Sequence, residues 1–177
     1  MRNGRKALGT LRRACLAGAL IVLTATSVLG RYTLTKIEES VITAWLAQHP
    51  EYRRATVRDC ECDEELRAIR TGYGGLWKAV PDYNPYKVSG DFHGDGVDDI
   101  AVVVLDTRRH GDAFALVILN GPFSAEPKAA FMKTGLDMKQ QGLFYGPPRP
   151  KPYRLVLGRF EADGTMLVPS GKTYRLE

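Results

Sequence analysis

The sequence is poor in the residues that most often carry catalysis: among 177 residues it has three histidines and three cysteines. Nucleophilic catalysis needs a serine, cysteine or threonine beside a base, and the base needs an orienting acid. The sequence contains no Gly-x-Ser-x-Gly elbow, no phosphate-binding glycine loop ending in Lys-Ser or Lys-Thr, and no His-Glu-x-x-His motif. Catalytic triads also assemble from residues far apart in a sequence, so these absences argue against an enzyme without deciding the question.

The chain also lacks an excess of positive charge outside its first residues. Its formal net charge is +5, but Arg2, Arg5, Lys6, Arg12 and Arg13 lie in a segment without an acidic residue, and residues 31–177 hold 20 basic and 20 acidic residues. Nucleic-acid binding needs a basic patch or stripe. We therefore predict no nucleic-acid partner.

Residues 1–30 have the order of an export signal, because a basic start precedes an apolar run over residues 14–30. We interpret them as a signal peptide, cleaved after Ser27 or Gly30, or as an uncleaved membrane anchor. The apolar run is at the short limit for a spanning helix, and the positive residues before it would keep that end in the cytoplasm. Both alternatives predict a periplasmic or otherwise extracytoplasmic protein, and the second adds a membrane contact through residues 14–30.

Acidic residues alternate with small ones between residues 91 and 99, immediately before an apolar run. Calcium takes six to eight oxygen ligands, and such an alternation directs several carboxylates at one centre. The glycines at positions 94 and 96 allow the backbone to turn tightly enough. The candidate ligands are the side chains of Asp91, His93, Asp95 and Asp99 and the carbonyl of Val97.

The run from Gly90 to Val102 resembles the calcium loop of FG-GAP and related VCBS-type repeats, over about thirteen residues. The resemblance implies that Asp91, Asp95 and Asp99 are side-chain ligands and that Val97 contributes its carbonyl. At the third position of the loop, His93 offers nitrogen where a hard cation prefers oxygen. Three interpretations follow: a structural calcium site, a metal-free loop stabilised by Asx turns, and a site for a softer metal that uses His93.

FG-GAP repeats build propellers, which need at least four blades, and this sequence has one copy of the loop. We therefore expect a single α+β domain over residues 31–177 and not a propeller. Cys60 and Cys62 are its only cysteines. In an oxidising compartment they would close a small disulfide that fixes a turn, or alternatively serve as a redox pair or a two-thiolate metal site.

The pattern of the domain is helices first and strands afterwards. A capping box at Thr35–Glu38 opens a helix that ends near His49, with Ile37, Val41, Ile42, Trp45 and Leu46 at helical spacing. A second helix is expected over 63–71, with Leu66 and Ile69 facing inward and Gly72 at its end. Strands are expected at 100–105 and 113–119, forming a buried hairpin, and at 141–145, 154–158, 165–168 and 172–176. The sum is N-terminal helices packed on a mainly antiparallel sheet.

Two connecting segments have alternative interpretations. Tyr73, Trp77, Tyr83 and Tyr86 would line a ligand groove or, more commonly, seal a small core. The proline-rich residues 146–152 are expected to form an extended surface loop, which would be a plain stiff linker or alternatively a polyproline recognition segment.

These patterns favour an exported or membrane-anchored, non-catalytic domain with a structural calcium loop, binding an unknown protein or small ligand at the cell envelope. A periplasmic inhibitor or assembly factor would have the same features. The alternative is an envelope hydrolase or thiol-redox protein that uses Cys60 and Cys62 or the acidic cluster.

Overall fold

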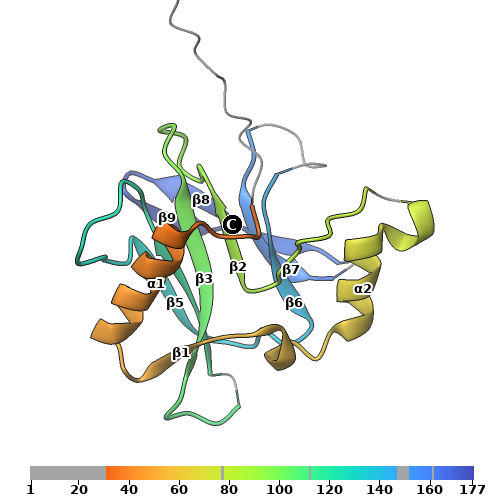
Figure 1. Cartoon of the computed structure of the whole chain (residues 1–177), viewed down its shortest axis with the longest axis horizontal. Helices are drawn as coiled ribbons and strands as arrows, with labels where there is room; N and C mark the ends of the chain where they lie inside the picture. The colour runs from red at the N-terminus through yellow and green to blue at the C-terminus, as the bar shows by residue number, and fades with distance from the viewer. Residues whose placement is uncertain (1–30, 77, 112, 147–151, 161) are drawn as a thin grey trace, which may run out of the picture.

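The computed structural model describes residues 31–177 except 77, 112, 147–151 and 161. The predicted signal or anchor over residues 1–30 and most of the proline-rich loop lie outside these residues. Among the residues that are described, no helix is long and apolar enough to cross a membrane. The predicted α+β class is confirmed, because this part of the chain forms two α-helices and two antiparallel sheets (Figure 1). The helices are α1 (Lys36–Gln48) and α2 (Asp63–Thr71), and two short 3-10 helices cover Val57–Asp59 and Tyr73–Gly75.

The first sheet, sheet A, is built around the predicted hairpin. Its strands are β1 (Tyr52–Arg54), β2 (Lys87–Gly90), β3 (Asp99–Asp106), β4 (Phe114–Leu119) and β5 (Phe131–Leu136). β3 pairs antiparallel with β4, so that Val102 is opposite Val117. β1 and β2 pair with the two ends of β3 along its other edge, and β5 pairs with β4. The long apolar runs of β3 and β4 therefore lie in the centre of the sheet and are buried.

The second sheet, sheet B, is a meander in which each strand pairs with the next in sequence. It consists of β6 (Gln141–Phe144), β7 (Leu155–Arg159), β8 (Gly164–Ser170) and β9 (Thr173–Leu176). Its four strands agree within a few residues with the four that the sequence predicts. The sequence pattern did not indicate that they form a sheet of their own.

Helix α1 covers one face of sheet A. The predicted capping box is present: Thr35 accepts a hydrogen bond from the Glu38 N–H, and the Glu38 side chain accepts one from the Thr35 N–H. Ile42 and Trp45 are buried against the side chains of β3 and β4 on this face. The apolar residues at helical spacing were expected to face the core, and for Ile37 this prediction is wrong, since 69% of Ile37 is exposed. The adjacent Glu38 takes the inward position because Ser89 and Arg31 donate hydrogen bonds to its carboxylate.

Sheet B covers the opposite face of sheet A, and the core between the sheets is rich in aromatic side chains. Tyr83 and Tyr86 are each about 1% exposed, so these two belong to the core rather than to an open groove. The Tyr86 hydroxyl donates a hydrogen bond to the Met138 carbonyl. The Tyr83 hydroxyl, by contrast, has no hydrogen-bond partner among the described residues. Trp77 lies outside the described residues.

Helix α2 lies on the side of the molecule opposite α1 (Figure 1) and packs against the aromatic core through Leu66 and Ile69. It ends as predicted at Gly72, whose φ of +74° is a left-handed conformation that glycine adopts without a steric penalty. The guanidinium of Arg70, on α2, donates two hydrogen bonds to the Tyr83 carbonyl. These bonds attach the connection after α2 to the body of the domain.

Candidate functional site

The loop between β2 and β3, residues 91–98, is folded around the carboxylate of Asp91. This carboxylate accepts backbone hydrogen bonds from Gly94 at 2.6 Å, Asp95 at 3.0 Å and Gly96 at 2.8 Å. Gly94 and Gly96 have φ values of +83° and +87°, which explains why the turn uses glycine at both positions. Asp91 therefore organises the turn, an arrangement that both the cation loop and the metal-free loop stabilised by Asx turns would have.

His93, at the third position of the loop, lies between two carboxylates. Its Nδ1 is 2.7 Å from Asp99 Oδ2, and its Nε2 is 3.0 Å from Asp95 Oδ2. Burial opposes protonation of the imidazole, but the hydrogen bond to Asp99 and the neighbouring carboxylates outweigh it and raise the pKa of His93. When the ring is protonated, both nitrogens are donors and each has a carboxylate oxygen as acceptor.

Asp99 begins β3 and is fully buried. Besides the contact with His93, its carboxylate accepts hydrogen bonds from the backbone N–H of Phe92 at 2.9 Å and of Gly121 at 3.1 Å. The Tyr174 hydroxyl lies 3.2 Å from Asp99 Oδ2. Burial raises the pKa of Asp99, and the hydrogen bonds offset only part of this effect. Asp99 thus connects the loop with the end of β4 and with β9.

Two tyrosine hydroxyls, from Tyr145 directly after β6 and from Tyr174 on β9, bond to the loop and to Asp99. The Tyr174 hydroxyl also lies 2.9 Å from the side-chain oxygen of Asn120, and the Tyr145 hydroxyl donates a hydrogen bond to the Asp91 carbonyl. Burial, together with the negative charge of Asp99, raises the pKa of Tyr174. Burial likewise raises the pKa of Tyr145, to about 12, so both phenols are neutral donors at physiological pH.

Asp98 turns away from the centre of the loop and pairs with Arg31. The Arg31 guanidinium lies 2.6 Å from Asp98 and 2.9 Å from Glu38. The backbone of Arg31 also makes two hydrogen bonds of 2.8 Å with Ser89 on β2. Residue 31 is thereby attached next to the acidic loop, a contact that no pattern in the sequence indicated.

With His93 neutral, the loop provides a donor set that fits a divalent cation. Ligand atoms of Asp91, His93 and Asp99 all lie within 4.8 Å of one another, close enough for one ion to contact the three residues. Of the other predicted ligands, the Asp95 carboxylate bonds to His93 and to the Val97 N–H, and the predicted role of the Val97 carbonyl stays a prediction. Two carboxylates and one imidazole are compatible with calcium and with softer metals, so the donor set does not select one ion.

The cysteines form a disulfide between Cys60 and Cys62, whose Cα atoms are 5.2 Å apart. Both residues are buried, at 0% and 1% exposed, directly before α2. Glu61 between them has a φ of +55°, in the left-handed region that non-glycine residues rarely adopt. In this state neither sulfur is available as a thiolate.

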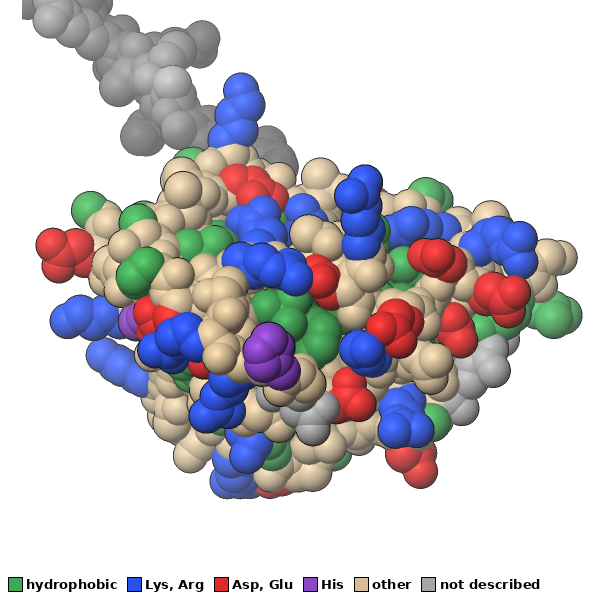
Figure 2. Space-filling view, turned by 90° about the horizontal axis from the view of Figure 1, so that it is seen from below, with side chains coloured by type: hydrophobic (Ala, Val, Ile, Leu, Met, Phe, Trp, Pro, Cys, Tyr) green, Lys and Arg blue, Asp and Glu red, His purple; other side chains and the backbone are tan. Residues whose placement is uncertain are grey.

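The exposed surface that Figure 2 shows carries both signs of charge. Lys and Arg side chains and Asp and Glu side chains are spread over this face, and the hydrophobic areas between them are small. Several basic residues are paired: Arg53 with Asp59 at 2.7 Å and Arg54 with Glu39.

Comparison with protein-family models, with curated proteins and with solved structures gave no match for this chain.

Proposed function

We propose that the protein is an exported or membrane-anchored, non-catalytic binding domain of the cell envelope, stabilised by a divalent cation in the 91–98 loop and Asp99. The resemblance of the loop to FG-GAP loops favours calcium as this cation. The observation that supports this proposal is the convergence of Asp91, His93 and Asp99 at the start of the central strand β3. An ion there would join the β2–β3 connection to the buried central strand β3. Its chemistry would be structural, because the cluster is already occupied in holding three segments together.

Export and the envelope location are proposed from residues 1–30. The attachment of Arg31 to Ser89, Glu38 and Asp98 fits this proposal, since it places the beginning of the folded domain directly after that segment. An anchor at residues 14–30 would hold the domain close to the membrane, on the side that carries the acidic loop.

The cation is tested by thermal unfolding of the full-length protein in detergent, with millimolar calcium and then with excess chelator. An ion that binds only the folded state increases the free energy of unfolding by RT ln(1 + [L]/Kd), and the unfolding midpoint rises as a result. We expect a rise of several degrees that chelator reverses. The Asp91→Asn variant should lose the shift, whereas Asp163→Asn, in the β7–β8 turn, should keep it. An unchanged midpoint in the unmodified protein, with calcium, manganese and zinc alike, would contradict the cation site.

The alternative is thiol-redox chemistry at Cys60 and Cys62. Its only structural support is that the two cysteines are joined, and their burial disfavours it because reagents and partner thiols need access to a sulfur. Alkylation with a fluorescent maleimide after mild reduction distinguishes the two functions. Rapid labelling of the folded protein would favour redox chemistry, and labelling only above the unfolding midpoint would favour a structural disulfide.

A further inference from the structure

The chain passes from sheet A to sheet B through residues 137–140, which connect β5 to β6. This connection is attached to the turn that the disulfide closes, residues 60–62. The backbone N–H of Gln140 donates a hydrogen bond of 2.7 Å to the Cys60 carbonyl. Cys60 Sγ lies 3.9 Å from the carbonyl oxygen of Gln141, the first residue of β6. The disulfide turn therefore contacts the chain at the point where sheet B begins.

The disulfide turn is itself fixed in the core of the domain. Both cysteines belong to the same cluster of buried side chains as Met138 of the connection. The Cys62 carbonyl accepts a hydrogen bond of 3.0 Å from the Leu66 N–H, so the turn leads directly into α2. A change in the shape of the turn would redirect the Cys60 carbonyl, which is the acceptor for the connection.

Two residues at this contact have a backbone conformation that residues other than glycine rarely adopt. The φ angle is +55° at Glu61 and +53° at Gln140. Such conformations persist only where the surroundings enforce them. Glu61 is enclosed by the disulfide on both sides. Its ion pair with Lys139, at 2.6 Å, contributes little because both side chains are more than half exposed. The covalent bond is therefore the main constraint on the turn.

The size of the closed loop indicates where the disulfide acts. The stabilisation that a disulfide gives by restricting the unfolded chain grows with the number of residues it encloses, and here it encloses one. Its main effect is therefore on the folded turn. Reduction by dithiothreitol transfers two electrons and two protons, leaving two thiols and the cyclic disulfide of the reagent. Glu61 is then free to return to a negative φ, and the Gln140 N–H loses its acceptor.

We propose that the Cys60–Cys62 disulfide is a redox-dependent latch that holds residues 137–141, and with them the start of sheet B, on the body of the domain. With the cysteines oxidised the latch is closed; with two thiols it is open at Gln140 while sheet A stays folded. The latch needs neither a cation nor a binding partner, so it goes beyond the proposed function and is tested separately. If the chain is exported as proposed, the latch closes outside the reducing cytoplasm, where a disulfide oxidant accepts the two electrons and two protons.

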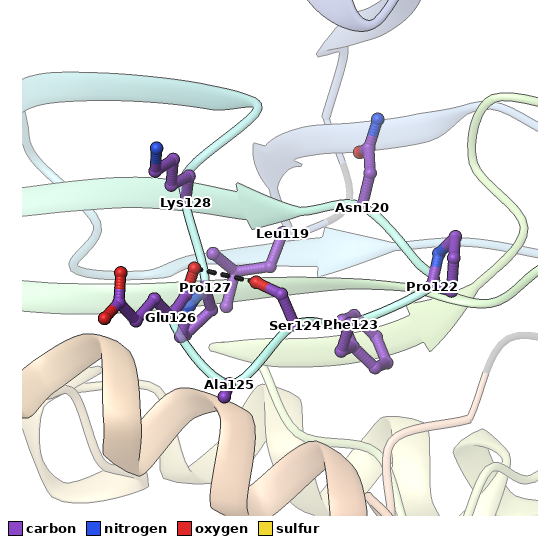
Figure 3. A pocket seen from close by; sticks show the side chains of 9 residues that line it. All are labelled: Leu119, Asn120, Pro122, Phe123, Ser124, Ala125, Glu126, Pro127 and Lys128. Carbon is purple, nitrogen blue, oxygen red and sulfur yellow. Dashed lines mark hydrogen bonds between the residues drawn. The ribbon is translucent and has the colours of Figure 1, made fainter.

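The connection between β4 and β5 provides an internal reference for this test. Residues 119–128 curl around an open hollow of about 620 Å³, and the Ser124 hydroxyl donates a hydrogen bond of 2.7 Å to the Glu126 carbonyl (Figure 3). This bond joins residues two positions apart and does not involve the cysteines. The amides of this connection, like those at the centre of β3 and β4, should therefore keep their exchange rates whether the latch is open or closed.

The experiment is amide hydrogen exchange, followed by NMR, on the full-length protein in detergent and chelator. The oxidised protein is compared with the Cys60→Ser/Cys62→Ser double variant and with Glu61→Gln, which removes the ion pair and keeps the disulfide. In the double variant we expect the Gln140 amide to exchange at least about tenfold faster, the change that the loss of one ordinary hydrogen bond produces. Amides of β3, β4 and residues 119–128 should stay within about twofold of the oxidised protein. Glu61→Gln should leave Gln140 within the same limit, and unmodified protein prepared throughout in dithiothreitol should match the double variant.

Four results would overturn the latch. Gln140 exchange that is the same in the double variant and the oxidised protein would show that the disulfide does not hold the connection. Equal acceleration at Gln140 and throughout β3 and β4 would make the bond a general staple. A double variant without protected amides in β3 and β4 would contradict the expectation that sheet A stays folded. An effect of Glu61→Gln as large as that of the double variant would assign the attachment to the ion pair.

Discussion

The central strand β3 begins and ends with a buried aspartate, and the two ends are held in different ways. Asp99 at one end is bonded to groups from the 91–98 loop, the end of β4 and β9. Asp106 at the other end is 7% exposed and is bonded mainly to its neighbour Arg108, through the backbone N–H at 3.0 Å and the guanidinium at 3.0 and 3.1 Å. One end joins segments that are distant in sequence, and the other stabilises a single turn.

The difference shows how the same residue type can have a global or a local role. A carboxylate that satisfies several buried donors makes each of them dependent on it, because an unsatisfied buried donor is costly. Removing a carboxylate that pairs with exposed arginines lowers the stability of the protein only a little, since water replaces the carboxylate as the partner of the arginines. The two ends should therefore respond very differently to equivalent changes.

The largest effect is expected for Asp99→Ala. It leaves the N–H groups of Phe92 and Gly121 without their acceptor and takes a carboxylate partner from His93, so the free energy of unfolding should fall by about 3–5 kcal/mol. The Tyr174 hydroxyl keeps the Asn120 oxygen as an acceptor. Urea denaturation followed by tryptophan fluorescence measures the loss. A decrease below about 1 kcal/mol would mean that Asp99 does not connect these segments.

A smaller effect at the same end is expected for Gly121→Ala. The added methyl group would lie 2.5 Å from both the Asp98 carbonyl and Val97 Cγ1, so the loop or the end of β4 must move. Overpacking of this kind costs about 1–3 kcal/mol of unfolding free energy. Gly171→Ala is not a suitable control, because φ is +63° there and an alanine would strain the backbone. The control is Ala125→Gly, on the exposed part of the same connection, which tests whether any change in this segment has the same effect. Equal losses in both variants would contradict the steric explanation.

Removal of the carboxylate at the other end, in Asp106→Ala, should lower the unfolding midpoint by about 2 °C. The Arg108 side chain is 66% exposed and returns to water when its partner is lost. Differential scanning calorimetry of this variant beside Asp99→Ala gives the comparison directly. A midpoint decrease as large as that of Asp99→Ala would show that the two ends are equivalent after all.

The pKa values of Asp99 and Asp106 should also be shifted in opposite directions from 3.8, the ordinary value of an aspartate side chain. Burial raises the pKa of Asp99, whereas hydrogen bonds from Arg108 lower the pKa of Asp106. A raised folded-state pKa means that ionised Asp99 opposes folding above that pKa, and this penalty disappears as the pH falls through it. A lowered pKa means that Asp106 stabilises the fold above 3.8 and loses this contribution as the pH falls further. Carboxyl carbon NMR shifts of the two residues, recorded in chelator, measure both values, and equal values would contradict the comparison.

Local patterns predicted the elements whose signals are contained in short stretches. The α1 capping box, the end of α2 at Gly72, the β3–β4 hairpin and the turn around Asp91 all depend on residues a few positions apart. The partners of Asp99 could not be predicted in this way, because Gly121 and Tyr174 are 22 and 75 positions away. The proximity of Arg31 to Asp98, at a separation of 67, has the same explanation.

The sequence analysis did not predict β1, β2 and β5, because these strands lack an alternation of apolar and polar residues. β1 and β2 have three and four residues, too few to show an alternation. β5 has exposed residues on both faces, so apolar and polar positions do not alternate in it. The hollow of residues 119–128 was likewise invisible, because its shape depends on how one connection curls rather than on residue types.

The separation of the two sheets along the chain sets an order of events during synthesis. Every strand of sheet A lies before residue 137, whereas sheet B occupies residues 141–176. Because the N-terminus is synthesised first, sheet A and α1 can form while the face of sheet A that sheet B will cover is still in contact with solvent. Until the final meander arrives, Leu116 and Ile118 are uncovered on that side, and the growing chain is exposed to aggregation for as long as it takes to add the last forty or so residues.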